Sequence, residues 1–198
     1  MCIICVSRPG VRLPNRTEIE EMFFNNPHGA GYMFARDGRV IIHKGFMNID
    51  DFLRAFESEG LTEKDSVVCH FRISTQAGVN PEMTHPFPLS NHLGHMKALD
   101  LSCPIGVAHN GIIPLTTDRT QHEYSDTALF IAKYLSNIIS RPEDLRNQDY
   151  LDIIERMIQS KMVLMDGDGY IATIGHFIKD RGLLYSNASY LPFGGFAG

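Results

Sequence analysis

Apolar residues in this chain occur mostly in short runs of the length that is typical of strands. The first run, residues 2–7, is almost continuous and predicts a buried strand. Asp37-Gly38 and the Asp-Gly-Asp-Gly stretch at 166–169 are turn sequences that each separate two such runs, so both predict β-hairpins. The strands that the pattern predicts are 2–7, 31–36, 39–43, 66–73, 105–109, 162–165, 170–174 and 183–185.

Helical signals are confined to four segments. Thr17 and Glu20 have the spacing of a capping box, in which two side chains satisfy free backbone N–H groups at the start of a helix. Between residues 49 and 59, apolar side chains recur at helical spacing. The predicted helices are 17–24, 49–59, one that opens at Ser125 or Asp126, and one from about Pro142 to about Ser160.

The order of these elements indicates the fold class. Consecutive strands pair locally, which favours antiparallel sheets, and the helices arrive in groups rather than after every strand. We therefore expect an α+β protein in which two antiparallel sheets stack face to face with helices outside. We expect residues 1–198 to form a single domain.

Composition narrows the classes of partner. The 198 residues carry a net charge of −5, whereas a general binder of nucleic acid or membrane surfaces needs a basic face. No apolar run approaches the roughly 20 residues that span a bilayer, and the N-terminus shows no signal-peptide pattern. The sequence therefore predicts a cytoplasmic protein with no nucleic-acid and no membrane partner.

The four cysteines do not indicate a metal or redox centre. They are widely scattered, and a chain of this kind is not expected to carry a disulfide framework. Cys2 and Cys5 form a Cys-x-x-Cys pair, but residues three apart in a strand face opposite sides, which disfavours shared metal binding. The nine histidines include no His-x-x-x-His pair on a helix. We expect neither a metal nor a cofactor.

Cys2 directly follows the initiator methionine, and this position gives it a possible chemical role. We expect an aminopeptidase to remove Met1, which would leave a thiol and a free α-amine on one residue. An α-amine titrates at about 7.7–8.0, so it could take the thiol proton and make the sulfur nucleophilic. The alternative is that Cys2 only begins a buried strand, as free cysteines often do.

Three further polar clusters lie where strands or loops are expected to meet helices. Each has an ordinary structural interpretation: Arg72 as a salt-bridge partner, Asn110-Gly111 as a hairpin turn, and Asp126 as a helix cap. His70 and His109 lie on predicted strands and are expected to be structural. The clusters are His70 to Gln76 with Asn80 and His85, then His109 to Ile112, then Ser125 to Thr127.

Taken together and in order, Cys2, Arg72 with Thr75, Asn110-Gly111 and Asp126 resemble a class II glutamine amidotransferase domain, a member of the N-terminal-nucleophile (Ntn) hydrolases. The similarity covers nearly the whole chain. It also includes residues 28–32, Lys44-Gly45 and Tyr185-Ser186-Asn187. The resemblance implies a four-layer αββα sandwich and an enzyme that hydrolyses the side-chain amide of glutamine and releases ammonia.

The resemblance also implies a role for each residue. Cys2 is the nucleophile, and the Asn110 side-chain amide with the Gly111 backbone N–H stabilises the oxyanion. Arg72 would hold the substrate carboxylate through its planar fork of donors, and Asp126 would accept from the substrate ammonium. The remaining candidate substrate-binding residues are Thr75, Gln76 and His85.

Three alternatives stay open for the substrate and partner. Family members usually pass ammonia to a synthase; here either a separate partner protein supplies the synthase or the chain acts alone as an amidase. Ile73 and Gln76 stand where many relatives carry an aromatic residue and a histidine, so the substrate could instead be a γ-glutamyl conjugate or another small amide. The third possibility is a catalytically inactive binding protein of the same fold.

Overall fold

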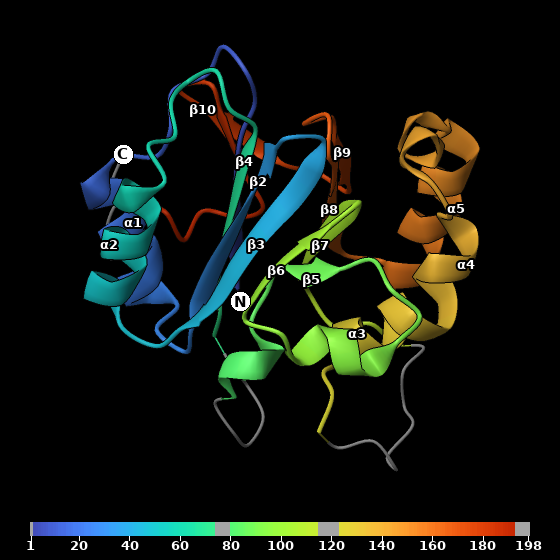
Figure 1. Cartoon of the computed structure of the whole chain (residues 1–198). Coiled ribbons are helices and arrows are strands. Elements are labelled where there is room, and N and C mark those ends of the chain that lie inside the picture. The colour runs from blue at the N-terminus through green and yellow to red at the C-terminus, as the bar shows by residue number, and fades with distance from the viewer. Residues whose placement is uncertain (1, 74–79, 115–122, 193–198) are drawn as a thin grey trace.

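The computed structural model describes residues 2–73, 80–114 and 123–192. Within these ranges the strands form two sheets in which every neighbouring pair is antiparallel. The larger sheet has the order β10-β11-β1-β4-β2-β3-β6 and the smaller one β5-β7-β8-β9. The chain is therefore an α+β protein with two antiparallel sheets, as the sequence predicts (Figure 1).

The strands of the larger sheet are β1 (Ile3–Ser7), β2 (Ala30–Arg36), β3 (Arg39–Phe46), β4 (Val67–Phe71), β6 (Asp100–Cys103), β10 (Ile178–Asp180) and β11 (Leu183–Tyr185). Those of the smaller sheet are β5 (Phe87–Pro88), β7 (Ile105–Asn110), β8 (Lys161–Asp166) and β9 (Ile171–Ile174). The strand β1 lies inside the larger sheet between β11 and β4, with Ile3 opposite Phe71 and Cys5 opposite Cys69. Both of its edges are therefore paired.

Two groups of helices accompany the sheets. The first group is α1 (Arg16–Asn25) and α2 (Ile49–Ser58), which lie beside the larger sheet (Figure 1). The second group lies beside the smaller sheet and comprises α3 (Asp126–Phe130), a π-helical turn η3 (Ile131–Leu135), α4 (Ser136–Ile138) and α5 (Gln148–Ile158). Short 3₁₀ helices complete the described elements: η1 (Pro81–Met83), η2 (Leu93–Lys97) and η4 (Pro142–Arg146). No helix in the described ranges is long and apolar enough to cross a membrane.

Alternation along β1 separates its side chains between two hydrophobic clusters. Ile3 and Cys5 belong to the cluster that also contains apolar residues of α1 and α2. Ile4 and Val6 belong to a second cluster, which contains residues of both sheets, among them Ala108 of β7. A third cluster joins the opposite face of the smaller sheet to α3 and α5. One face of β1 thus looks toward the helices and the other toward the smaller sheet.

Most predicted elements are confirmed. The Asp37-Gly38 turn has φ of 52° and 73°, the left-handed pair that a type I′ hairpin requires, and joins β2 to β3. The helix expected over 49–59 is α2. The helix expected from Pro142 is divided, because a 3₁₀ turn over Pro142–Arg146 precedes α5. Three strands were not predicted, namely β5, β6 and β10.

The predicted start of α1 is wrong. The capping box is formed by Asn15 and Glu18, not by Thr17 and Glu20. Asn15 Oδ1 accepts from the Glu18 backbone N–H at 2.9 Å, and the Glu18 carboxylate accepts from the Asn15 N–H at 2.9 Å. Asn and Ser are at least as good as Thr at this position, so the two boxes could not be separated by pattern alone.

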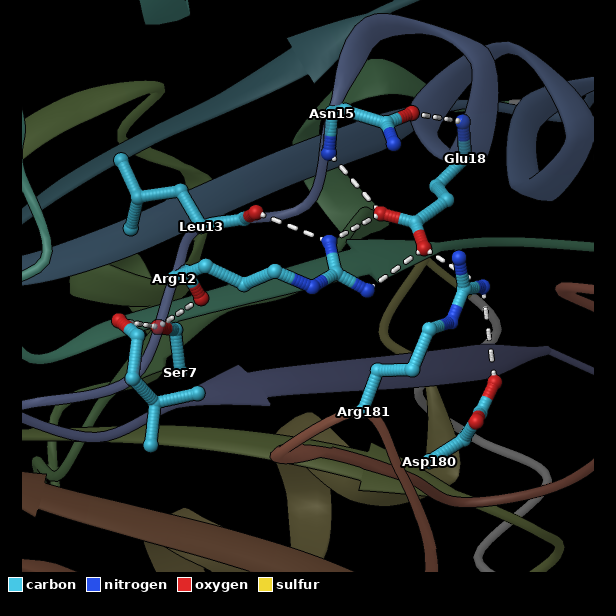
Figure 2. A network of polar contacts seen from close by, with 8 residues as sticks. Ser7, Arg12, Leu13, Asn15, Glu18, Asp180 and Arg181 are labelled. Atoms are coloured by element: carbon cyan, nitrogen blue, oxygen red, sulfur yellow. Dashed lines mark hydrogen bonds and ion pairs between the residues drawn. The ribbon is translucent and has the colours of Figure 1, made fainter.

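Besides capping α1, the Glu18 carboxylate binds two arginines. Its carboxylate receives a two-pronged contact from Arg12 at 2.6 and 2.7 Å and a further contact from Arg181 at 2.9 Å (Figure 2). Burial by itself would raise the pKa of this carboxyl, but Arg12, the Asn15 N–H and Arg181 together hold it below its ordinary value. The network fastens the segment after β10 to the first turn of α1.

Candidate active site

Cys2 lies immediately before the first residue of β1. Because β1 and β4 are antiparallel, this end of β1 is beside the last residue of β4. By alternation Cys2 shares the face of Ile4, which looks toward the smaller sheet. Its thiol is partly buried and donates to the Ile73 carbonyl at 3.6 Å. Its own carbonyl accepts from Asn187 Nδ2 at 2.6 Å. Contacts on two sides thus fix the backbone that carries the thiol.

Burial raises the pKa of the Cys2 thiol above its ordinary value of 9.0, and the positive charge of Arg72 offsets only part of that rise. The thiol is therefore predominantly protonated at neutral pH. A nucleophilic role would need a base that removes the proton during attack. The α-amine that removal of Met1 would expose belongs to the same residue, although Met1 itself lies outside the described residues.

Arg72 follows β4 and comes beside Cys2 because β1 and β4 are antiparallel. Its backbone is held at both polar atoms: the N–H donates to the Gly29 carbonyl at 2.8 Å and the carbonyl accepts from the His28 N–H at 2.9 Å. Nη1 of its guanidinium is buried without a hydrogen-bond partner, and no ion pair joins Arg72 to a carboxylate among the described residues. The structural salt bridge that Arg72 could have formed is not present among these residues.

Asn110 ends β7, where it pairs with Lys161 of β8. Its side chain is buried; Nδ2 donates to Ser186 Oγ at 2.8 Å, while Oδ1 is buried without a partner. The alternative of a type I′ turn at Asn110-Gly111 is wrong, because such a turn needs positive φ at both residues and only Gly111 has it.

Position 111 strongly favours glycine over every other residue type. Its φ is +149°, and a Cβ built on it would lie 2.4 Å from Ser160 Cβ. Glycine thus lets the chain leave β7 sharply and leaves the Gly111 N–H close to the end of the strand. This N–H and the amide of Asn110 are adjacent donors on one turn.

Asp126 opens α3, but the N-cap is Ser125, whose Oγ accepts from the Ala128 N–H at 3.2 Å. The Asp126 carboxylate accepts from the Ile113 N–H at 2.7 Å through Oδ2 and from the Thr127 N–H at 2.7 Å through Oδ1. It thereby ties the turn after Gly111 to the start of the helix. Its described contacts include neither Cys2 nor Arg72.

His85 and His70 form a buried ring pair with centroids 4.3 Å apart. Neither nitrogen of His85 has a hydrogen-bond partner in the described residues. His70 Nε2 donates to the His109 carbonyl at 3.1 Å, while its Nδ1 is unpartnered. Burial lowers the pKa of both rings, that of His70 to about 3, so both are neutral at pH 7. His85 is therefore a buried neutral histidine whose two ring nitrogens have no hydrogen-bond partner among the described residues.

His109 is structural, as its position on a strand predicts. Its Nε2 lies 2.7 Å from Ser160 Oγ and its Nδ1 2.9 Å from Thr127 Oγ1. Since the Ser160 hydroxyl donates to the Ile158 carbonyl, the ring must donate through Nε2 and accept at Nδ1. Burial lowers its pKa to about 4, which agrees with this neutral form.

The unpartnered polar atoms of the described residues are concentrated here. Nine buried side-chain nitrogen or oxygen atoms lack a hydrogen-bond partner, and five of them belong to His70, Arg72, His85 and Asn110. A buried polar atom without a partner destabilises a fold by about 1–3 kcal/mol, so such atoms rarely gather by chance. Together they offer donors and acceptors that a small polar molecule could satisfy.

The predicted site residues are brought together to different degrees. Cys2 and Arg72 are neighbours across two strands, and Asn110 reaches the same strand end through Ser186, which also bonds to Ile4. Asp126 is connected to this group only through the turn at Ile113. Thr75 and Gln76 lie outside the described residues.

Sequence reasoning did not foresee the contacts of Ser186 and Asn187, although the stretch 185–187 was part of the resemblance. It also treated His70 as purely structural. A signal was present, because Ser186 and Asn187 directly follow the predicted strand 183–185 and are polar where the chain leaves a sheet.

The chain matches no protein-family model, and no curated protein matches it.

Proposed function

We propose that this chain is an N-terminal cysteine amidohydrolase of the class II glutamine amidotransferase type. The observation that carries the proposal is the convergence of three groups at one end of β1, β4 and β7. They are the partly buried thiol of Cys2, a buried guanidinium nitrogen of Arg72 without a partner, and the buried amide of Asn110, whose Oδ1 has no partner. Two stacked sheets with helices on their outer sides also suit the four-layer αββα sandwich of the Ntn hydrolases (Figure 1).

The reaction would begin once Met1 is removed. The Cys2 thiol transfers its proton to its own α-amine as sulfur attacks the side-chain amide carbon of glutamine. The carbonyl oxygen becomes an oxyanion, which receives hydrogen bonds from the Asn110 amide and the Gly111 N–H. The C–N bond then breaks, and the α-ammonium returns its proton to the departing ammonia. Water hydrolyses the thioester, releasing glutamate and restoring the thiol.

Recognition of the amino-acid end of glutamine would fall to Arg72. A guanidinium with a free, buried nitrogen binds a carboxylate strongly, because the pair is two-pronged and little water competes with it. Asp126 has both oxygens in backbone hydrogen bonds but retains lone pairs for an ammonium. His85, with two free ring nitrogens, would complete the wall on the side of His70.

The ammonia would be passed to a separate synthase or released into solvent. An amide other than glutamine, such as a γ-glutamyl conjugate, would use the same nucleophile and oxyanion donors. The alternatives therefore differ in what Arg72 and its neighbours bind, while the chemistry at Cys2 is shared.

The test combines the mass of the purified protein with an ammonia-release assay on glutamine and a panel of γ-glutamyl amides. We expect a mass without Met1, hydrolysis of glutamine, and loss of hydrolysis in Cys2→Ala. Retention of Met1, or full ammonia release by Cys2→Ala, would overturn the proposal. A γ-glutamyl amide that reacts faster than glutamine would identify the alternative substrate.

Arg72→Lys tests the substrate grip separately. This variant keeps the charge but loses the planar fork, so KM for glutamine should rise by about 10-fold or more while kcat changes little, as for loss of one charge-assisted contact. The matched control is Arg54→Lys on the exposed surface of α2. Equal KM values for Arg72→Lys and Arg54→Lys would remove Arg72 from the binding site.

A further inference from the structure

Ser186 links three strands near the candidate nucleophile. It follows β11, is completely buried, and exchanges two hydrogen bonds with Ile4 of β1: the Ile4 N–H donates to Ser186 Oγ at 2.9 Å, and the Ser186 N–H donates to the Ile4 carbonyl at 3.0 Å. Its carbonyl accepts from Lys161 Nζ of β8. Its hydroxyl lies 2.8 Å from the side-chain amide of Asn110. No role is assigned to Ser186 by the reaction proposed above.

The hydroxyl of Ser186 has one hydrogen and two lone pairs, and its neighbours decide where the hydrogen points. One lone pair is used by the Ile4 N–H. If the Asn110 nitrogen also donates to Ser186 Oγ, the hydroxyl hydrogen has no acceptor among the hydrogen bonds of the described residues. In the same arrangement Asn110 Oδ1 is buried without a partner. Two buried polar groups are then left unsatisfied side by side.

Turning the amide over by 180° removes one of these deficits. Its oxygen and nitrogen have nearly the same size, so the exchange needs no other movement. The Ser186 hydroxyl then accepts from Ile4 and donates to Asn110 Oδ1, and both partners are satisfied. The amide NH₂ takes the place of the unpartnered oxygen. The group that lacks a partner becomes a donor, which is what a developing oxyanion needs.

We propose that Ser186 is a positioning residue that fixes the orientation of the Asn110 amide, so that its NH₂ group faces the oxyanion formed at the substrate carbon. The inference rests on the proposed function. Because Ser186 is bonded to Ile4, two residues after Cys2, the same residue sets the nucleophile strand and the oxyanion donor relative to each other. Ser186 touches neither substrate nor sulfur in this reaction.

A double-mutant cycle with L-glutamine as substrate tests the inference. Asn110→Ala should lower kcat by about 10²–10³-fold, the loss typical of one oxyanion donor. Ser186→Ala should lower kcat by about twofold or more, because the amide then samples both orientations and only one of them is productive. In the double variant, kcat should equal that of Asn110→Ala alone, and KM should stay within about twofold throughout.

Ser7→Ala is the matched control, since Ser7 carries a buried hydroxyl at the far end of β1, where it donates to the Arg12 carbonyl at 2.7 Å. It should lose stability without loss of kcat. If Ser186→Ala does not fold, Ser186→Cys takes its place, because a thiol at the same position is a weaker donor and acceptor than the hydroxyl. The cycle is then read in the same way.

The outcomes separate the two proposals. Hydrolysis with multiplicative effects of the two substitutions, or with a rise in KM instead of a fall in kcat, overturns the role of Ser186 and leaves the amidohydrolase proposal in place. Failure of the wild-type protein to hydrolyse any amide of the panel overturns both.

Discussion

Substitution of Gly111 by Ala tests the turn on which the candidate oxyanion donors lie. Gly111 has φ of +149°, and a side chain at such a φ destabilises by about 1–3 kcal/mol. The added Cβ would lie 2.4 Å from Ser160 Cβ, whereas carbon atoms are in optimal contact at about 3.5–4.0 Å. Relieving such overpacking typically takes a further 1–3 kcal/mol or so. We therefore expect a loss of about 2–6 kcal/mol in unfolding free energy.

The same substitution should affect activity beyond its effect on stability. To move away from Ser160, the turn must shift the Gly111 N–H and the neighbouring Asn110. A displaced oxyanion donor lowers kcat by about 10²–10³-fold. Activity is therefore to be measured at a temperature at which circular dichroism shows the variant to be fully folded.

Two glycines of the same chain serve as matched controls for urea unfolding. Gly10 has φ of +84° with nothing within 4 Å of an added Cβ, so Gly10→Ala isolates the cost of backbone strain. Gly94 has open space and no positive φ, so Gly94→Ala should be close to neutral. The expected order of stability is Gly94→Ala, then Gly10→Ala, then Gly111→Ala. If Gly111→Ala were as stable as Gly94→Ala, the steric reasoning would be refuted.

Three further predictions concern ionisable groups. Burial lowers the pKa of the Lys44 amine to about 7, so the unfolded chain binds more protons than the folded one between pH 7 and the ordinary value of 10.5. Relative to Lys44→Met, the stability of the wild-type protein should therefore rise with pH across this window. A stability difference in urea melts that stays constant with pH would contradict this. The lowered pKa of Glu18 also makes stability rise with pH, but in an acidic window. The stability advantage over Glu18→Gln should be full at pH 7 and disappear as pH falls below 4.5 and through the folded pKa, which thermal melts at pH 7 and pH 3 measure. Cys2 is partly exposed, whereas the other three cysteines are buried, and burial raises the pKa of their thiols, that of Cys103 to about 12. A thiol reagent should therefore modify one cysteine rapidly in the native protein and none in Cys2→Ala.

The elements that sequence reasoning placed well are those with strong local signals. The Asp37-Gly38 turn needs left-handed backbone at both positions, and few other dipeptides supply it as readily. The helix α2 has a clear apolar face, formed by Phe52, Leu53 and Phe56. Buried strands such as β1 read as continuous apolar runs, because both of their faces are covered.

The three unpredicted strands are all at sheet edges. The strands β6 and β10 are the two edges of the larger sheet and β5 is an edge of the smaller one. Edge strands are short and partly polar, so alternation is weak: β5 has two residues, and β10 exposes Lys179. Their existence depends on neighbours that are distant in sequence, which no local pattern contains.

In the candidate site, too, local sequence signals identified some features, while contacts between distant residues could not be predicted. The residue types of Cys2, Arg72 and Asn110 could be singled out from the sequence. Strand alternation explains why Cys2 lies on the face of the larger sheet that looks toward the smaller sheet, whose strand β7 carries Asn110. What pattern could not supply is the partner of each side chain. The link from Ser186 to Asn110 joins residues 76 positions apart, and the unpartnered nitrogens of His85 become visible only when its surroundings are known.

The backbones at this site are held firmly while the side-chain ends are left free, and this contrast is the strongest physical argument for a binding role. Both backbone polar atoms of Arg72 are in hydrogen bonds, Asn110 is held by its pairing with β8, and the Cys2 carbonyl is held by Asn187. Because their backbones are fixed in this way, these groups cannot move toward one another, and their side-chain ends stay unsatisfied. An arrangement that is fixed before the ligand arrives loses little entropy on binding and stabilises charge without reorganising. If the free ends of Arg72, Asn110 and His85 were only packing defects, substituting them with apolar residues of similar shape would stabilise the protein and leave amide hydrolysis intact.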